Sequence, residues 1–183
     1  MGRLTQDQLK YILNKHDSEI STLIETGTCE GGFSSIASDV FKKVITIELN
    51  DYYYHKAKSN LGSLVNVDLI QGDSAKVLPE LLKKHKEPLF IYLDAHFFNC
   101  DNAEVPLIPR SEFPLFKELK AISKRKVKDI IVVDDVHSFG LERPDLRFSD
   151  APDWENVTTD SIVKSIGNVI DSEIIGDCFI IWK

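Results

Sequence analysis

The chain contains few cysteines, and their spacing argues against cysteine-based sites. Cys29, Cys100 and Cys178 lie far apart and no C-x-x-C pair is present, so neither a zinc site nor a disulfide framework is indicated. The first residues form no apolar signal region, and no apolar run approaches the ~20 residues that a membrane-spanning helix needs. These absences predict a cytoplasmic protein in a reducing compartment, without a membrane as a partner.

Positive charge is also scarce. The net charge is −7, and no dense run of lysine and arginine stands out. Two short basic stretches, residues 83–86 and 124–128, lie at expected helix ends, where cations interact favourably with the helix dipole. The charge balance argues against nucleic acid as a main partner.

No internal repeat, linker or low-complexity segment divides the chain. Its 183 residues, 43% of them hydrophobic and 28% charged, are ordinary for a soluble globular protein with one sizeable core. We therefore expect a single domain spanning residues 1–183. The sequence leaves open whether this domain is a monomer or a homodimer.

Five apolar runs each end in a carboxylate, and they are the most informative feature of the chain. The runs are Thr22–Glu25, Val44–Glu48, Val67–Asp73, Phe90–Asp94 and Ile130–Asp135. Short β-branched runs separated by longer helical patterns indicate parallel strands buried on both faces, hence an α/β fold. Ligands of open α/β sheets bind beyond the carboxyl ends of the strands. Carboxylates gathered at that edge repel phosphates and attract cations, metal ions or hydroxyl groups.

The remaining pattern predicts helices between these strands and a hairpin at the end. Thr5 and Gln8 form a capping box that begins the first helix. The other helical patterns are Gly32 to Phe41, a helix with Tyr52–Tyr54 in its first turn, a helix holding Val77 to Leu82, Leu115 to Ile122, and Asp160 to Ile166. Strands at Val169 to Ile175 and Cys178 to Trp182 flank Gly176-Asp177, which suits a type II′ turn.

Two long stretches lack any periodicity. They run from Phe97 to Phe113 and from Ser138 to Asn156, and both contain prolines. Loops of this length in a compact domain are usually functional or disordered. We expect Phe97 to Pro114 to form a mobile lid or a wall of the substrate site.

The loop after the first run is rich in glycine. It reads Ile24-Glu-Thr-Gly-Thr-Cys-Glu-Gly-Gly-Phe33. It lacks the Gly-Lys-Ser/Thr of a P-loop and the spacing of G-x-G-x-x-G, and Glu25 and Glu30 flank the place of a pyrophosphate. A glycine-rich turn that binds no ligand is the alternative.

Two acids beyond this loop favour an adenosine-type ligand. Glu48 lies about 20 residues past the loop, where an acid bonds ribose hydroxyls. Asp73 either accepts from an adenine amino group or caps a helix. The acidic loop requires a ligand tail without phosphates, and S-adenosylmethionine fits because its sulfonium and amine are cationic.

These residues carry a family resemblance. The runs Ile24-Glu-Thr-Gly-Thr-Cys-Glu-Gly-Gly, Ile47-Glu48, Gln71-Gly-Asp-Ser-Ala-Lys-Val-Leu-Pro and Leu93-Asp-Ala-His96 resemble class I S-adenosylmethionine-dependent methyltransferases, closest to the small bacterial macrocin O-methyltransferase type. Cys29-Glu30 departs from that pattern, because it replaces the second glycine of the usual loop.

The resemblance implies a three-layer Rossmann-like fold. Its mostly parallel seven-stranded sheet would have the order 3-2-1-4-5-7-6 with an antiparallel C-terminal hairpin. The implied cofactor-binding residues are Glu25, Thr26, Gly27, Thr28, Gly31, Glu48, Asp73, Ser74 and Asp94.

A second cluster follows the fourth and fifth runs. Asp94, His96, Asp134, Asp135 and His137 are expected to converge at neighbouring strand ends, where crowded carboxylates repel unless a cation lies among them. The resemblance implies that Asp94, Asp134 and Asp135 hold Mg²⁺ or another divalent cation. His96 or His137 would then be the general base, with Asp94 also in the catalytic set. Alternatively, one of the paired aspartates caps a turn and His96 only hydrogen-bonds in the cofactor pocket.

The sequence thus predicts an enzyme that transfers a methyl group from S-adenosylmethionine to a hydroxyl of a small-molecule acceptor. The resemblance makes that acceptor a sugar or another polyhydroxylated metabolite. Two alternatives stay open. One is a nicotinamide-dependent oxidoreductase, and the other is a protein that binds S-adenosylmethionine without catalysis.

Overall fold

The fold is described from a computed structural model, over residues 4–96, 113–141 and 154–183. Seven strands form one sheet in the order β3-β2-β1-β4-β5-β7-β6. Their bounds are β1 Thr22–Thr26, β2 Lys43–Glu48, β3 Val67–Gln71, β4 Phe90–Leu93, β5 Ile130–Val133, β6 Asp171–Ile175 and β7 Cys178–Trp182. Strands β1 to β5 pair in parallel, whereas β7 pairs antiparallel with β5 and β6. The predicted α/β class, strand order and terminal hairpin are confirmed.

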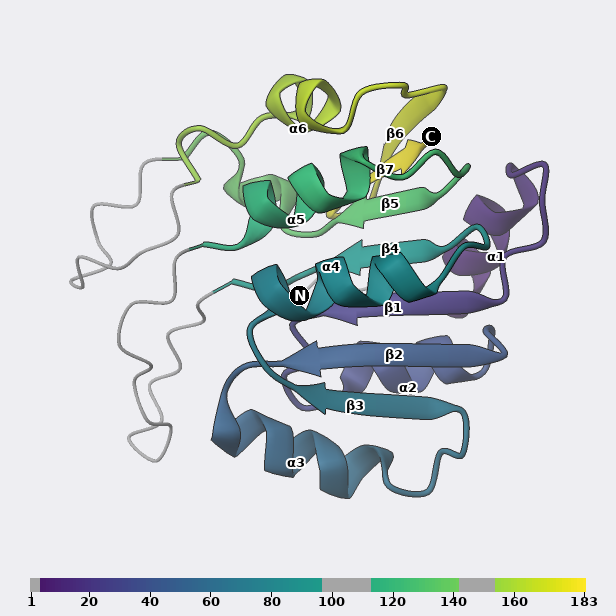
Figure 1. Cartoon of the computed structure of the whole chain (residues 1–183), viewed down its shortest axis with the longest axis vertical. Coiled ribbons are helices and arrows are strands. Elements are labelled where there is room, and N and C mark those ends of the chain that lie inside the picture. Colours follow the sequence, from purple (N-terminus) through teal and green to yellow (C-terminus); the bar gives the residue numbers. More distant parts are fainter. Residues whose placement is uncertain (1–3, 97–112, 142–153) are drawn as a thin grey trace.

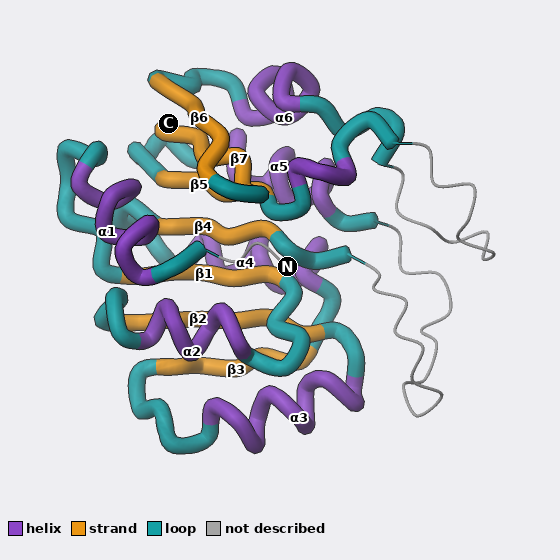
Figure 2. Tube along the Cα trace, turned by 180° about the vertical axis from the view of Figure 1, so that it is seen from behind, coloured by secondary structure: helices purple, strands orange, loops and turns teal. Residues whose placement is uncertain are grey.

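Helices cover both faces of the sheet (Figures 1 and 2). Helices α4, α5 and α6 lie on one face, α1 and α2 lie on the other, and α3 lies beside β3 at the sheet edge. Their bounds are α1 Gln6–Asn14, α2 Gly32–Ser38, α3 Asp51–Leu61, α4 Ser74–Lys84, α5 Leu115–Ser123 and α6 Thr159–Ile166, with a 3₁₀ turn, η1, at Val136–Ser138. The mostly parallel sheet is therefore the middle of three layers, as predicted.

Successive side chains of the central strands pack alternately into two hydrophobic cores, one on each face of the sheet. On β4, Phe90 and Tyr92 pack with α1 and α2, whereas Ile91 and Leu93 pack with α4, α5 and α6. All four side chains are buried. Burial on both faces explains why these strands read as continuous apolar runs.

The predicted start and end signals are present, with one shortened helix. Thr5 and Gln8 form the capping box of α1. Gly176 has φ 62° in the two-residue turn between β6 and β7, as a type II′ turn requires at its first position. Helix α2 ends at Ser38 rather than at Phe41, because Phe41 leaves the helix and packs against Phe90 on the sheet, with ring centroids 5.3 Å apart.

The two irregular stretches lie mostly outside the described residues. Residues 97–112 and 142–153, and with them the predicted lid, are not described. The flanking parts are regular: α5 begins at Leu115, directly after Pro114, and η1 follows β5. None of the helices in the described ranges is long and apolar enough to cross a membrane.

Candidate cofactor and acceptor site

The glycine loop between β1 and α2 is shaped by contacts within the protein. Gly27 has φ 85°, and a Cβ there would lie 2.2 Å from the carbonyl oxygen of Asp94. Gly31 also has φ 85°, and a Cβ there would lie 2.8 Å from the Leu61 side chain. Both glycines are needed for conformation and for close packing. The loop thereby comes close to the end of β4, where the second predicted cluster begins.

Two predicted cofactor residues brace this loop from beneath. The Glu25 carboxylate is buried and accepts hydrogen bonds from Ser34 Oγ and from Thr46 Oγ1, the latter at 2.6 Å. The Thr28 hydroxyl lies 2.5 Å from Thr46 Oγ1. These side chains are directed toward α2 rather than toward the strand-end edge. They fix the loop, together with the backbone N–H groups of Gly27, Thr28, Cys29 and Gly31, which also donate within the protein.

Glu48 ends β2 and is tied to the same loop. Its Oε2 accepts from the backbone N–H of Cys29 at 2.8 Å, and its Oε1 accepts from that of Asn50 at 2.8 Å. Burial raises the pKa of Glu48, although these backbone donors oppose the rise. Each carboxylate oxygen retains a lone pair, so Glu48 can also accept from a ribose at this edge.

Asp73 adopts the helix-cap arrangement that the sequence left as an alternative. It is the N-cap of α4, and its Oδ1 accepts from the Ala75 N–H at 3.0 Å. Its Oδ2 lies 3.1 Å from Lys76 Nζ. The cap places Asp73 and the buried Ser74 where β3 meets α4, on the same edge as Glu48.

A buried carboxyl group that the sequence did not reveal lies near this edge of the sheet. Glu118 in the first turn of α5 is 1% exposed, and its Oε1 has no hydrogen-bond partner among the described residues. Burial raises the pKa of Glu118 to about 7, while the hydroxyls of Ser74 and Thr26 oppose the rise. Thr26 Oγ1 is likewise buried without a partner of normal geometry within the described ranges. Two adjacent buried polar atoms thus lie under the end of β1.

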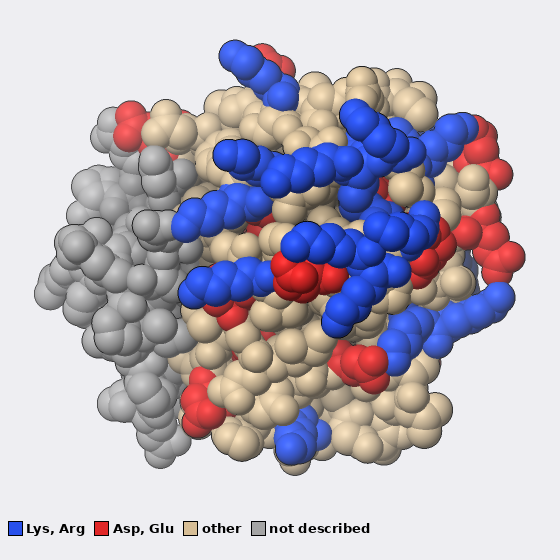
Figure 3. Space-filling view, in the orientation of Figure 1, with Lys and Arg blue, Asp and Glu red and all other residues tan. Residues whose placement is uncertain are grey.

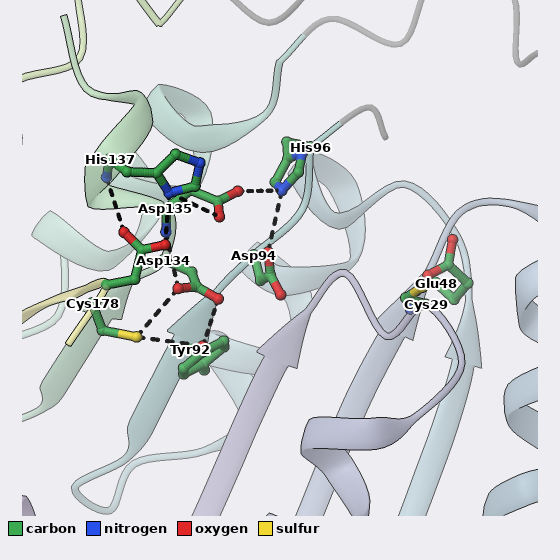
Figure 4. Close-up of polar contacts among 10 residues, drawn as sticks. Cys29, Glu48, Tyr92, Asp94, His96, Asp134, Asp135, His137 and Cys178 are labelled. Carbon is green, nitrogen blue, oxygen red and sulfur yellow. Dashed lines mark hydrogen bonds and ion pairs between the residues drawn. The ribbon is translucent and has the colours of Figure 1, made fainter. Parts of the chain in front are cut away.

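The second predicted cluster converges in part (Figure 4). His96 Nε2 lies 2.6 Å from Asp135 Oδ2 and 3.4 Å from Asp94 Oδ1. One ligand atom of each residue falls within 4.8 Å of the others, so the three could hold a metal ion. Burial raises the pKa of Asp94 to about 6, with His96 opposing the rise. Burial lowers the pKa of His96, but hydrogen bonds to Asp135 and Asp94 outweigh it and raise that pKa to about 10.

Asp134 is directed away from this trio and into the protein (Figure 4). Its Oδ2 accepts from Tyr92 Oη at 2.7 Å, and its Oδ1 accepts from Cys178 Sγ at 3.2 Å and from the Asp135 N–H at 2.9 Å. Burial raises the pKa of Asp134, and these donors oppose the rise. Asp135 has φ 61°, a left-handed conformation that directs the two neighbouring carboxylates to different environments.

His137 is held by a residue that the sequence did not single out. Its Nδ1 lies 2.6 Å from Asp177 Oδ2, and its backbone N–H donates to Asp177 Oδ1 at 2.9 Å. The Asp177 carbonyl also accepts from the Val136 N–H at 2.9 Å. The turn between β6 and β7 therefore fixes the position and the tautomer of His137 through one aspartate.

Aromatic rings line the same side of the site as His96. The Trp154 ring lies edge-on to His96 with centroids 5.7 Å apart, and it also packs against Phe113 and Phe139. Trp154 is 4% exposed. It restricts the movement of the His96 ring.

Comparisons with known proteins identify the fold. No family model matches the chain, and no curated protein matches it. Among solved structures, an O-methyltransferase from Bacillus cereus in complex with SAH is 15% identical, with a TM-score of 0.60 over 97% of this chain and 78% of that chain. A putative methyltransferase from Streptococcus mutans in complex with SAH is 14% identical, with a TM-score of 0.59 over 100% of this chain and 99% of that chain. The chain thus has the fold of S-adenosylmethionine-dependent methyltransferases.

Proposed function

We propose that this protein transfers a methyl group from S-adenosylmethionine to a hydroxyl of a small acceptor, and that the acceptor is a sugar or another polyhydroxylated metabolite. One observation carries the cofactor part: Glu48 ends β2 beside the glycine loop and holds the Cys29 N–H. A carboxylate in this place suits ribose hydroxyls. The solved methyltransferases with SAH share the fold, which supports the proposal.

The residues around the loop fit the chemistry of this cofactor. Glu48, Asp73 and Asp94 supply acceptors where β2, β3 and β4 end. Thr26 Oγ1 and Glu118 Oε1, which are buried without a hydrogen-bond partner among the described residues, lie near them. A carboxylate-rich edge favours the sulfonium and the amine and disfavours the pyrophosphate of a nicotinamide cofactor. When bound, S-adenosylmethionine supplies the electrophilic methyl group. The chain's own part is to align that group with an acceptor oxygen.

A divalent cation fits the second cluster through a revised set of ligands. Asp94, Asp135 and His96 offer one nitrogen and carboxylate oxygens at adjacent strand ends. Such a mixed set suits Mn²⁺, Fe²⁺ or Zn²⁺ as well as Mg²⁺. A bound cation would lower the pKa of an acceptor hydroxyl. Asp134, whose oxygens accept from Tyr92 and Cys178, would position Asp135 rather than bind the ion.

Of the two histidines, His137 is better arranged to remove the proton from the hydroxyl group that receives the methyl. Its ring is exposed, and Asp177 holds its Nδ1, which leaves Nε2 directed outward as the acceptor atom. His96 instead lies between two carboxylates. The arrangement of His137 and Asp177 is that of a base and its orienting carboxylate.

Calorimetric titration tests the cofactor class. S-adenosylmethionine should bind in the micromolar range and NAD should not bind, because the acidic edge repels its pyrophosphate. Binding of NAD alone would favour an oxidoreductase. Tight binding of S-adenosylmethionine without methyl transfer to a broad panel of hydroxylated acceptors would favour a protein that binds the cofactor without catalysis.

Glu48→Ala should weaken S-adenosylhomocysteine binding at least about tenfold, since hydrogen bonds to a charged group contribute ~1.5–3 kcal/mol. Loss of the bond to the Cys29 N–H could weaken binding indirectly, so a second ligand separates the two effects. The wild-type protein should prefer S-adenosylhomocysteine to its 2′-deoxyribose analogue, and Glu48→Ala should bind both equally. A preference that survives in Glu48→Ala would contradict the assignment of Glu48 to the ribose.

A further inference from the structure

Positive charge gathers on one face of this acidic protein (Figure 3). We call the outer surface of α4, α5 and the turns that follow them the lysine face. Within residues 74–96 and 113–129 it exposes nine lysines: Lys76, Lys83, Lys84, Lys86, Lys117, Lys120, Lys124, Lys126 and Lys128. The same ranges expose two carboxylates, Glu80 and Glu87. Since the whole chain has a net charge of −7, the residues outside these ranges carry a strongly negative net charge.

The carboxylates of this region do not neutralise the lysine face. Glu80 pairs with Lys83 at 2.6 Å, and Glu87 pairs with His85 at 2.6 Å. Carboxylates from neighbouring segments pair with two more lysines: Asp73 with Lys76 at 3.1 Å and Asp17 with Lys128 at 3.0 Å. Five of the lysines have ammonium groups that make no ion pair or hydrogen bond with any described residue: Lys84, Lys86, Lys120, Lys124 and Lys126. The face therefore presents uncompensated charge to its surroundings.

Helix ends do not account for this charge, because buried cations already occupy them. Arg125 donates to the carbonyls of Leu82 and His85 at the end of α4. Lys183 donates to the carbonyls of Ile122 and Arg125 at the end of α5. Further lysines around these ends add repulsion between like charges rather than a cap. Such repulsion lowers stability, which points to another use for the lysines.

We propose that the lysine face docks an acidic protein surface. Lysine ammonium groups are point charges that suit carboxylates without fixed geometry. The described part of the chain exposes no arginine, whose planar fork suits phosphate and base edges. Phe116 is the one large exposed apolar side chain on this face within the described ranges, which gives little scope for base stacking.

The size of the positive region also favours a compact partner over a long polyanion. A nucleic acid that extended beyond α4 and α5 would meet the acidic remainder of the surface and be repelled. An acidic protein of limited contact area would meet the lysines alone. The lysine face lies on helices that cover one side of the sheet, whereas the candidate site lies at the strand ends (Figure 1). The partner can thus bind while the candidate site stays open.

A pair of matched charge-reversal variants tests the proposal. The face variant combines Lys84→Glu, Lys120→Glu and Lys124→Glu. The control combines Lys10→Glu, Lys42→Glu and Lys58→Glu, which are exposed outside the lysine face and change the net charge equally. The probe is fluorescently labelled poly-L-glutamate, titrated by anisotropy at low and at physiological ionic strength.

The wild-type protein should bind poly-L-glutamate in a salt-dependent manner, and the face variant should bind it at least about tenfold more weakly. The control should stay close to the wild type. The face variant should also melt at a higher temperature than the control, because it relieves repulsion. The proposal would be overturned by no binding at low ionic strength, by equal losses in both variants, or by tighter binding of poly-uridylate than of poly-L-glutamate. Self-association at low salt that the face variant abolishes would also overturn it, in favour of a second copy of this chain.

Discussion

Glu118→Gln should stabilise the protein at pH 8 and leave its stability unchanged near pH 4. Burial raises the pKa of Glu118 to about 7 from an ordinary value of 4.5. Below 4.5 the carboxyl is protonated in both the folded and the unfolded states. Between 4.5 and 7 the unfolded state loses the proton first, so stability falls as the pH rises through this window. Above pH 7 the folded protein bears the full free-energy cost of burying the ionised carboxylate, which is on the order of 1–3 kcal/mol.

Glutamine keeps the shape of the side chain and its hydrogen-bonding capacity without the charge. The free energy of unfolding of Glu118→Gln, measured with denaturant at pH 4, 6 and 8, should exceed that of the wild type by a margin that grows with pH. Glu155→Gln is the matched control, because Glu155 is exposed and its removal should change stability little at any pH. A gain for Glu118→Gln that is equal at all three pH values would contradict a buried carboxyl with a raised pKa.

Much of the fold could be predicted because buried parallel strands leave a plain signal. The run Phe90–Asp94 is apolar at four successive positions, since both faces of β4 are covered. The hairpin could be predicted from Gly176-Asp177, where backbone geometry selects the residue type. The order of the strands came from the family resemblance, because pairing depends on contacts between segments that are distant in the sequence.

The candidate site could be predicted less completely, for a related reason. Glu48 ends the apolar run of β2 and Asp94 follows that of β4, so both could be predicted as site residues from the local sequence. Asp177 acts on His137 from 40 residues away, and Tyr92 reads as an ordinary core residue of β4 although its hydroxyl holds Asp134. Glu118 reads as one of several charged residues in the α5 pattern, and the packing of α5 in the folded chain buries it. Residues that interact only through the tertiary structure leave no local pattern in the sequence.

The lysine face shows the same limit for surface charge. Each basic stretch alone is explained by a helix end, and that interpretation fits residues 83–86 and 124–128 taken separately. The fold places α4 beside α5 and supplies Arg125 and Lys183 as the buried caps. The positive charges of the two stretches then lie on one surface, and their sum is not explained by the helix ends.

Asp134→Asn and Asp135→Asn should have opposite consequences, although the two residues are adjacent. Asp135 contacts His96 and can bind an ion with Asp94. Asp135→Asn should therefore reduce the affinity for Mn²⁺ at least about tenfold, since the lost bond involves a charged ligand. Its stability should change little, because asparagine tolerates the left-handed φ of 61° at this position.

Asp134→Asn should instead lower the free energy of unfolding by about 1–3 kcal/mol. An amide group would turn a donor toward Tyr92 Oη, Cys178 Sγ or the Asp135 N–H, each of which now donates to Asp134. Tyr92→Phe is the matched control, because it removes one of these donors and leaves Asp134 intact. It should be destabilised as well, with the affinity for Mn²⁺ nearly unchanged.

Calorimetry with Mn²⁺, before and after treatment with EDTA, gives the ion affinity, and denaturant unfolding gives the stability. An equal loss of ion affinity in Asp134→Asn and Asp135→Asn, with unchanged stability in both, would make Asp134 a ligand and remove its positioning role. Once an acceptor is found, full methyl transfer in excess EDTA would exclude the ion from the reaction. His137 and Asp177 would then have to activate the hydroxyl without it, and a strong dependence of turnover on Asp177 would be the remaining signature of that route.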